Sequence, residues 1–120
     1  WPVRGSVISG YGPKKAGYHN DGVNIRARLG ATVQASESGV VVHASNKLQG
    51  YGNLVLIKHQ NGWVTAYAHN DKILVRKGQQ VARGQAVAEV GSTGRVDSPQ
   101  LHFEMRKGSR AVNPTLYLKS

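Results

Sequence analysis

The chain has 120 residues, of which 16 are lysine or arginine, 6 are acidic and none is cysteine, so its formal net charge is +10. This length predicts one domain with a single packed core. The lack of cysteine excludes a disulfide framework and a thiolate metal site, so histidine and carboxylate side chains would have to hold any metal. No apolar run reaches the roughly 18 residues of a membrane-spanning helix.

The positive charge favours an acidic or carboxylate-rich partner. Nucleic acid is the first candidate, but the basic residues are scattered through predicted turns. No recognition helix, zinc finger or aromatic stacking motif accompanies them. We therefore expect no nucleic-acid partner, and a basic surface that is simply solvated is the alternative.

Fifteen glycines fall between short runs rich in β-branched residues, and this pattern predicts an all-β domain. Strands are expected, in chain order, over residues 3–9, 23–25, 32–35, 39–44, 54–59, 63–69, 86–90 and 100–106. Asn61-Gly62 joins two of these runs and is typical of a β-hairpin turn. Asn113 as N-cap and Pro114 at the first helical position predict one short C-terminal helical turn.

Two of the predicted strands carry polar side chains of the kind found in sites. In the first strand, alternation with a period of two places four side chains on one face: Trp63, Thr65, Tyr67 and His69. In the second, apolar residues face a core, and the opposite face carries Gln100, His102, Glu104 and Arg106. Neighbours on that face lie roughly 6.5 to 7 Å apart. An imidazole flanked by an amide and a carboxylate indicates either a functional site or an ordinary hydrogen-bonded surface histidine.

The sequence resembles the LytM (lysostaphin-type) zinc peptidase family over nearly its whole length. The resemblance is carried, in order, by Asp21-Gly22-Val23-Asn24-Ile25, Gly39-Val40-Val41-Val42, Tyr51-Gly52-Asn53, Leu56-Ile57-Lys58-His59, Thr65-Ala66-Tyr67-Ala68-His69, Gly78 to Gln85, Gly91-Ser92-Thr93-Gly94, Leu101-His102-Phe103-Glu104 and Val112-Asn113-Pro114. It implies a barrel-sandwich-like antiparallel β-sheet with a groove, forming one domain over residues 1–120. We expect this domain to be the C-terminal part of a longer envelope protein.

Active members of this family hold zinc with a histidine and an aspartate of an H-x-G-x-D block and with the second histidine of an H-x-H block. In this chain the first two positions hold Asn20 and Asn24, and the H-x-H block begins with Gln100, so His102 alone remains of the ligands. Carboxamides are poor zinc donors. The resemblance therefore implies an inert domain that needs no cofactor, with a former active-site groove formed by Asn20, Asn24, Tyr67, His69, Gln100 and His102.

A shifted zinc site is the alternative. His19 and Asp21 flank Asn20 and, together with His102, offer two imidazoles and a carboxylate. A shift of one residue in an extended segment turns a side chain to the opposite face, although a bulge would weaken that objection. With such ligands the domain would be an active zinc endopeptidase of peptidoglycan.

Inert domains of this family resemble regulators of the Gram-negative envelope. This likeness implies a periplasmic protein at the division septum that activates peptidoglycan amidases (N-acetylmuramoyl-L-alanine amidases) for daughter-cell separation. The expected partners are such an amidase, peptidoglycan, or both, and the domain itself is expected to be a monomer. A passive peptidoglycan-binding domain is the further alternative.

Overall fold

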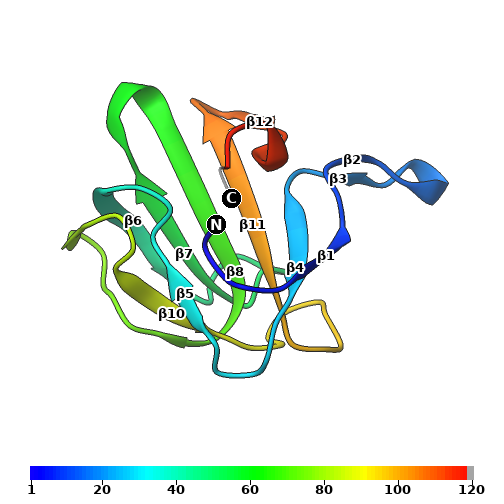
Figure 1. The fold of residues 1–120 in the computed structure, drawn as a ribbon, viewed down its shortest axis with the longest axis horizontal. Coiled ribbons are helices and arrows are strands. Elements are labelled where there is room, and N and C mark those ends of the chain that lie inside the picture. Colours follow the sequence, from blue (N-terminus) through cyan, green and yellow to red (C-terminus); the bar gives the residue numbers. More distant parts are fainter. Residues whose placement is uncertain (119–120) are drawn as a thin grey trace.

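The computed structural model describes residues 1–118 as a strongly curved antiparallel sheet with no α-helix in that range (Figure 1). The strands are β1 (Ser6–Ser9), β2 (Gly12–Pro13), β3 (His19–Asn20), β4 (Val23–Arg26), β5 (Thr32–Gln34), β6 (Gly39–Ser45), β7 (Asn53–Lys58), β8 (Trp63–Ile73), β9 (Gln80–Val81), β10 (Ala86–Val90), β11 (Gln100–Lys107) and β12 (Arg110–Val112), and β2 and β3 form a separate two-stranded ribbon. Single 3-10 turns are η1 (Lys15–Gly17), η2 (Gln60–Gly62) and η3 (Pro114–Leu116). The all-β prediction is confirmed. Within residues 1–118, no helix could cross a membrane.

The main sheet has the strand order β1-β4-β11-β8-β7-β6-β9. β5 and β10 pair with each other, β10 also pairs with β8, and β12 pairs with β11. The long strands β8 and β11 lie side by side at the centre, while the β2–β3 ribbon projects from one end of the molecule (Figure 1). Every ladder is antiparallel, as expected for strands joined by short connections.

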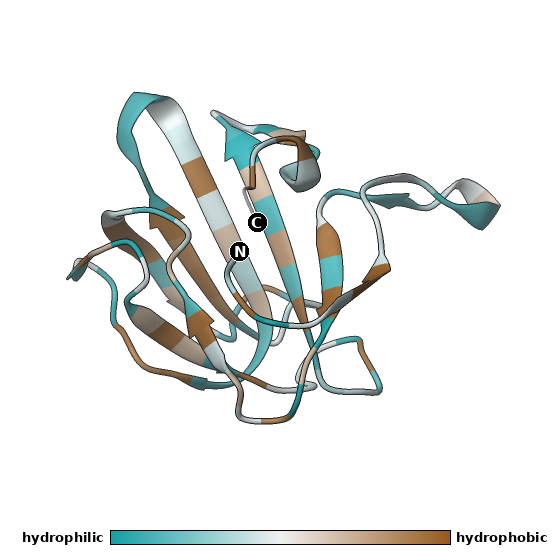
Figure 2. Ribbon diagram, in the orientation of Figure 1, coloured by the Kyte–Doolittle hydropathy of each residue, from teal (hydrophilic) through white to brown (hydrophobic). Residues whose placement is uncertain are grey.

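The core lies against one face of this sheet because the strand sequences alternate. Polar and apolar bands follow one another along β4 and β11 (Figure 2). The side chains of Val23, Ile25, Leu101 and Phe103 have no exposed surface. The alternate positions of both strands point to the opposite face, where the polar side chains gather.

Two turns predicted from the sequence are confirmed. Asn61 and Gly62 both have positive φ, of 63° and 79°, between β7 and β8. Such angles suit a tight hairpin connection and are the reason for the Asn-Gly preference. At the C-terminal end, the side chain of Asn113 accepts a hydrogen bond from Thr115 N at 3.1 Å and caps the turn that Pro114 begins.

One prediction about β8 is wrong: His69 does not share a face with Tyr67. Tyr67 pairs with Val55 and Asn70 pairs with Asn53, so β8 has one residue more than β7 over this stretch. His69 lies in this bulge with a positive φ of 69°. Its ring therefore turns to the other face, where its centroid lies 6.0 Å from that of His102.

Tyr67 belongs to the core and not to the groove in which the sequence analysis placed it. Its side chain has no exposed surface, and its ring centroid lies 5.3 Å from that of Phe103. Its hydroxyl is 2.7 Å from Thr65 Oγ1 and accepts a hydrogen bond from Ser36 N at 3.0 Å. This burial follows from alternation, since Phe103 pairs with Tyr67 across β8 and β11.

Tyr67→Ala should therefore destabilise the fold, because it opens a cavity and leaves buried hydrogen-bonding groups unpaired. We expect a loss of about 3–5 kcal/mol in the free energy of unfolding for Tyr67→Ala and about 1–3 kcal/mol for Tyr67→Phe, measured by urea denaturation. Tyr18→Ala is the control, because Tyr18 is 59% exposed. Equal stability of the Tyr67→Ala and Tyr18→Ala variants would contradict this assignment.

Candidate functional site

Three carboxamides form a chain of hydrogen bonds on the polar face of β4 and β11. Asn20 Nδ2 donates to Asn24 Oδ1 at 3.2 Å, and Asn24 Nδ2 donates to Gln100 Oε1 at 2.8 Å. Gly22 brings the segment in close, since a Cβ there would lie 2.1 Å from Phe103 O. The fold therefore brings together Asn20 and Asn24, which are 4 residues apart in sequence, and Gln100, which is 76 residues from Asn24.

His102 lies at the end of this amide chain, and both of its ring nitrogens face oxygens. The β4–β11 register sets His102 opposite Asn24. Its Nδ1 is 3.0 Å from Asn24 Oδ1, and its Nε2 is 2.8 Å from Glu104 Oε2. Because Asn24 Oδ1 also accepts from Asn20 and Glu104 is a carboxylate, both partners are acceptors. The imidazole is thus enclosed by protein groups on both sides.

Glu104 connects this histidine to a positive charge. Arg106 donates from Nε and from Nη2 to Glu104 Oε1, each at 2.8 Å. Burial by itself would raise the pKa of Glu104, but the hydrogen bonds and positive charges of His102 and Arg106 outweigh it, so its pKa lies below the usual range. Tyr51 OH donates to the other carboxylate oxygen at 3.4 Å. Both oxygens of the Glu104 carboxylate are therefore held by hydrogen bonds to neighbouring side chains.

His69 lies beside His102 and remains neutral. Burial is the main cause of a lowered pKa of His69, and the neighbouring His102 lowers it further, although a hydrogen bond to Thr93 O acts in the other direction. That bond, at 2.8 Å, assigns the proton to Nδ1. The Nε2 atom is then the acceptor of the neutral ring.

These residues do not fit a zinc site. Zinc prefers imidazole nitrogen, thiolate and carboxylate donors, whereas the three positions in question hold amides that bond to one another. Within residues 1–118, no group of at least three histidine, aspartate or glutamate side chains is arranged to hold a metal ion. The three amide side chains are instead joined to one another by hydrogen bonds.

The structure also shows where the alternative ligands lie. His19 Nδ1 is 3.0 Å from Asp21 Oδ1, and the two side chains are 44% and 48% exposed. Asp21 Oδ2 lies 3.6 Å from Arg106 Nη2. His19 and Asp21 thus form a surface pair, and among the described residues His102 does not join them in a metal-holding cluster.

Most of the predicted site residues are buried and form the floor beneath more exposed side chains. Asn20, His69, Gln100 and His102 are each less than 9% exposed. Above them lies a connected set of more accessible side chains, here called the docking face, made of His19, Asp21, Asn24, Tyr51 and Arg106. Sequence alternation placed Arg106 on this side. Tyr51, from the loop before β7, belongs to a block that carries the family resemblance but was not predicted as a site residue.

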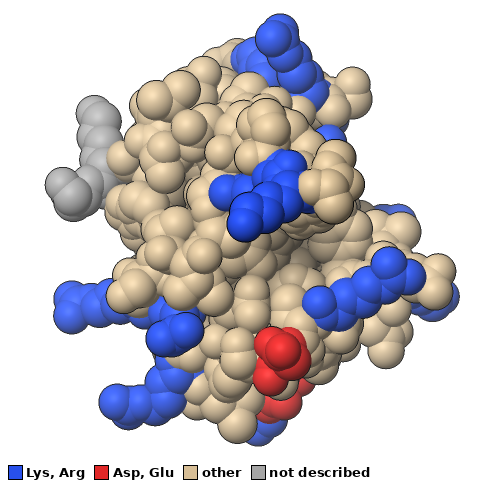
Figure 3. Space-filling model, turned by 90° about the vertical axis from the view of Figure 1, so that its right-hand side faces the viewer, with Lys and Arg blue, Asp and Glu red and all other residues tan. Residues whose placement is uncertain are grey.

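Basic side chains are scattered over one side of the molecule and form no single patch there. Figure 3 shows lysine and arginine side chains spread over the side of the molecule that carries the β2–β3 ribbon, with one small acidic group among them. This distribution agrees with the scattered basic residues of the sequence. The charge therefore acts as a general positive field.

The buried Glu104 makes acid stability a test of the network. Its depressed folded-state pKa adds stability that is fully present above its unfolded pKa of about 4.3 and is lost as the pH falls through the folded-state pKa. Glu104→Gln should cost about 3 kcal/mol at pH 7, and the difference from wild type should shrink below pH 4. Urea unfolding at several pH values measures this, with the exposed Asp97→Asn as control. Parallel pH profiles of wild type and Glu104→Gln would refute it.

Comparison with known proteins places this geometry in a family. Peptidase family M23 matches residues 18–114. The cell division protein DipM of Caulobacter vibrioides is 48% identical, and the match covers 98% of this chain and 20% of DipM. The murein hydrolase activator NlpD of Escherichia coli is 47% identical over 98% of this chain and 30% of NlpD.

A solved structure shows the same fold. The catalytic domain of the antimicrobial peptidase lysostaphin from Staphylococcus simulans superposes with a TM-score of 0.87 at 33% identity, over 97% of this chain and 93% of that domain. Since this chain spans less than a third of DipM and of NlpD, it corresponds to one part of those proteins. The family match, the identities and the shared fold together establish that the chain belongs to peptidase family M23, as a LytM-type domain.

Proposed function

We propose that this domain is a catalytically inactive LytM-type regulator that binds and activates a peptidoglycan amidase. The observation that carries the proposal is the hydrogen-bonded chain Asn20–Asn24–Gln100, which occupies the positions where the family resemblance expects two zinc ligands and an assisting histidine. The names of the relatives support it, because one is a murein hydrolase activator and another a cell division protein.

The chemistry of the site supports inactivity. Hydrolysis of a peptide bond needs an activated water, which in this family a metal would supply by lowering the pKa of the water toward about 7. Here the three carboxamide side chains are uncharged and hydrogen-bonded to one another. The Glu104 carboxylate is already paired with Arg106 and His102. His69, whose pKa is lowered by burial, would have no metal-bound water to assist.

The docking face supports a binding role. Tyr51 and Arg106 are residue types enriched at the centres of protein interfaces. They lie over a floor of hydrogen bonds that holds them in place, so little conformational entropy is lost on binding. The net charge of +10 favours an acidic partner and should act mainly on the rate of association.

We further propose that the domain acts in the periplasm of a Gram-negative bacterium, at the division septum. The amidase there cleaves the wall between daughter cells, and this domain would switch it on by binding. The likeness to NlpD and DipM, whose names refer to murein hydrolase activation and to cell division, supports this setting.

Restoring the family ligands should create a zinc site. The triple variant Asn20→His, Asn24→Asp and Gln100→His should bind one zinc ion. The β4–β11 register already positions residues 24, 100 and 102, and residue 20 already lies within hydrogen-bonding distance of residue 24. The wild-type protein and each single variant should bind zinc weakly or not at all. Metal content after dialysis against zinc, followed by elemental analysis, measures this.

Two results would contradict the assignment. Stoichiometric zinc in the wild-type protein, lost in a His19→Ala variant, would establish the shifted site instead. A triple variant that is folded by circular dichroism but free of zinc would show that Asn20 and Asn24 do not stand where the ligands of active relatives stand.

Amidase activation is the direct test. Purified envelope amidases are assayed on peptidoglycan with increasing amounts of this domain, and we expect stimulation by the wild-type protein. Tyr51→Ala should raise the concentration for half-maximal stimulation by about tenfold or more, as for a central interface residue. Leu29→Ala is the control, because Leu29 is 58% exposed and belongs neither to the docking face nor to the residues described below.

The salt dependence of the same assay tests the charge argument. Association should slow between 0.01 M and 0.15 M salt, because the screening length falls from roughly 30 Å to about 8 Å. Lys14→Glu, on the exposed β2–β3 ribbon, should slow association with little effect on dissociation. If no envelope amidase responds while the domain still sediments with peptidoglycan, the activator proposal is wrong and a passive wall-binding domain replaces it.

A further inference from the structure

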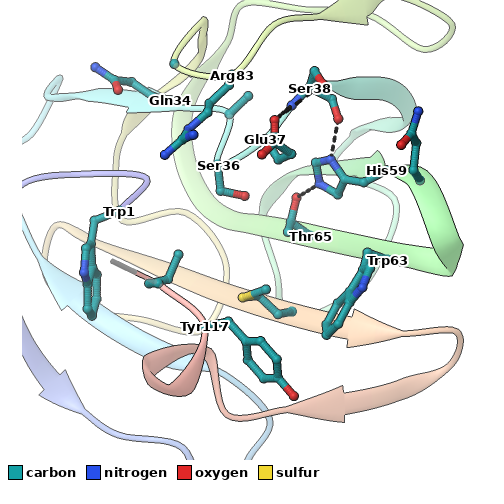
Figure 4. A pocket seen from close by; sticks show the side chains of 15 residues that line it. Trp1, Gln34, Ser36, Glu37, Ser38, His59, Trp63, Thr65, Arg83 and Tyr117 are labelled. Atoms are coloured by element: carbon teal, nitrogen blue, oxygen red, sulfur yellow. Dashed lines mark hydrogen bonds between the residues drawn. The ribbon is translucent and has the colours of Figure 1, made fainter. Parts of the chain in front are cut away.

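A second cleft lies on the side of the sheet opposite the docking face. Along β8 and β11 the side chains of Ala66, Ala68, His102 and Glu104 point to the docking-face side of the sheet. The cleft is lined instead by the alternate positions Trp63, Thr65 and Met105. It encloses about 820 Å³, which is in the size range of pockets that bind small ligands (Figure 4). None of the polar network described above faces it.

Aromatic side chains form one side of this cleft. Trp1, Trp63 and Tyr117 line it, and Trp1 and Tyr117 are 42% and 49% exposed. The ring centroids of Trp63 and Tyr117 lie 5.1 Å apart with an interplanar angle of 63°, and Lys107 Nζ lies 5.2 Å from the Trp63 ring. These contacts hold Trp63 and Tyr117 in place. The cleft thus offers large, partly fixed apolar surfaces that remain in contact with water.

The floor of the cleft is a fixed chain of hydrogen bonds. His59 Nδ1 lies 2.8 Å from Ser38 O, which only accepts, so Nδ1 carries a proton. In the neutral ring, His59 Nε2 then accepts from Thr65 Oγ1 at 2.7 Å, and Thr65 accepts from Tyr67 OH at 2.7 Å. Ser36 Oγ, 3.2 Å from that hydroxyl, ends the chain on the cleft side with lone pairs to spare (Figure 4).

Hydrogen-bonding side chains line the rest of the cleft. Two of them are charged, and the negative charge of Glu37 balances the positive charge of Arg83. Gln34, Glu37, Gln60 and Arg83 lie around the opening. The positive charge of Arg83 is near enough to help lower the pKa of Glu37, after the larger effect of the Ser38 backbone hydrogen bond. The cleft therefore differs from the rest of this +10 domain, because it favours a neutral ligand over an acidic one.

We propose that this cleft binds a neutral oligosaccharide. A pyranose ring presents flat apolar C–H faces and a rim of hydroxyl groups. The faces match the exposed rings of Trp1 and Tyr117, and the hydroxyls match the carboxamides of Gln34 and Gln60, which both donate and accept. The inference goes beyond the proposed function, because the domain would hold a saccharide on one side of the sheet and a protein partner on the other.

Tryptophan fluorescence gives a specific test. Trp1 and Trp63 are the two tryptophans of the chain, and both line the cleft, so the intrinsic emission reports on this site. The protein is titrated with cellotetraose and with the tetramer of N-acetylglucosamine. We expect a saturable change with at least one of them, and the pair distinguishes a plain from an N-acetylated sugar preference. An acidic hexapeptide should give no change.

Variants separate this cleft from the docking face. Tyr117→Ala and Gln34→Ala should each weaken saccharide binding by about tenfold, while Tyr51→Ala should leave it unchanged. Both cleft residues are exposed, so these variants should fold, which thermal unfolding verifies. Absence of any saccharide-dependent change, a wild-type response that survives in both cleft variants, or a response to the peptide alone would overturn the proposal. Amidase stimulation by Tyr117→Ala is measured in parallel, so that failure here is distinguishable from failure of the activator proposal.

Discussion

The register between β4 and β11 is the constraint on which the polar site depends. It sets Asn24 directly opposite His102 and brings Gln100 within reach of Asn24, so amide, amide and imidazole form one hydrogen-bonded row. Gly22 is necessary for this pairing because any side chain there would collide with the β11 backbone. A shift of one residue would send the whole polar row to the core side.

This polar row shows how buried amides and an imidazole can satisfy one another's hydrogen bonds within the fold. Each buried amide and imidazole needs a partner, since an unpaired polar group in the interior costs about 1–3 kcal/mol. The amides supply partners to each other, and Glu104 closes the row by joining His102 to Arg106. Hydrogen bonds therefore hold these side chains in place beneath the docking face.

The two faces of the central strands have different chemistry because strand side chains alternate. One face of β8 and β11 supports the polar row and the docking face, while the other supports the core and, at its open end, the aromatic cleft. The sheet separates these surfaces, so two ligands could be bound at once without contact. Under the two proposals, the protein partner and the saccharide would occupy opposite sides of the sheet.

The sequence by itself determined the all-β class, the main strands and the Asn-Gly hairpin, and it singled out the amides Asn20, Asn24 and Gln100, because alternation, turn chemistry and motif spacing are local properties. It placed His69 and Tyr67 on one face, whereas a bulge in β8 separates them. It also did not place Tyr51 in the site, and it did not indicate the cleft formed by Trp1, Trp63 and Tyr117. These features join residues from distant parts of the chain, and the bulge depends on pairing with both β7 and β10. Only the tertiary structure could decide them, because local periodicity carries no information on which strands become neighbours.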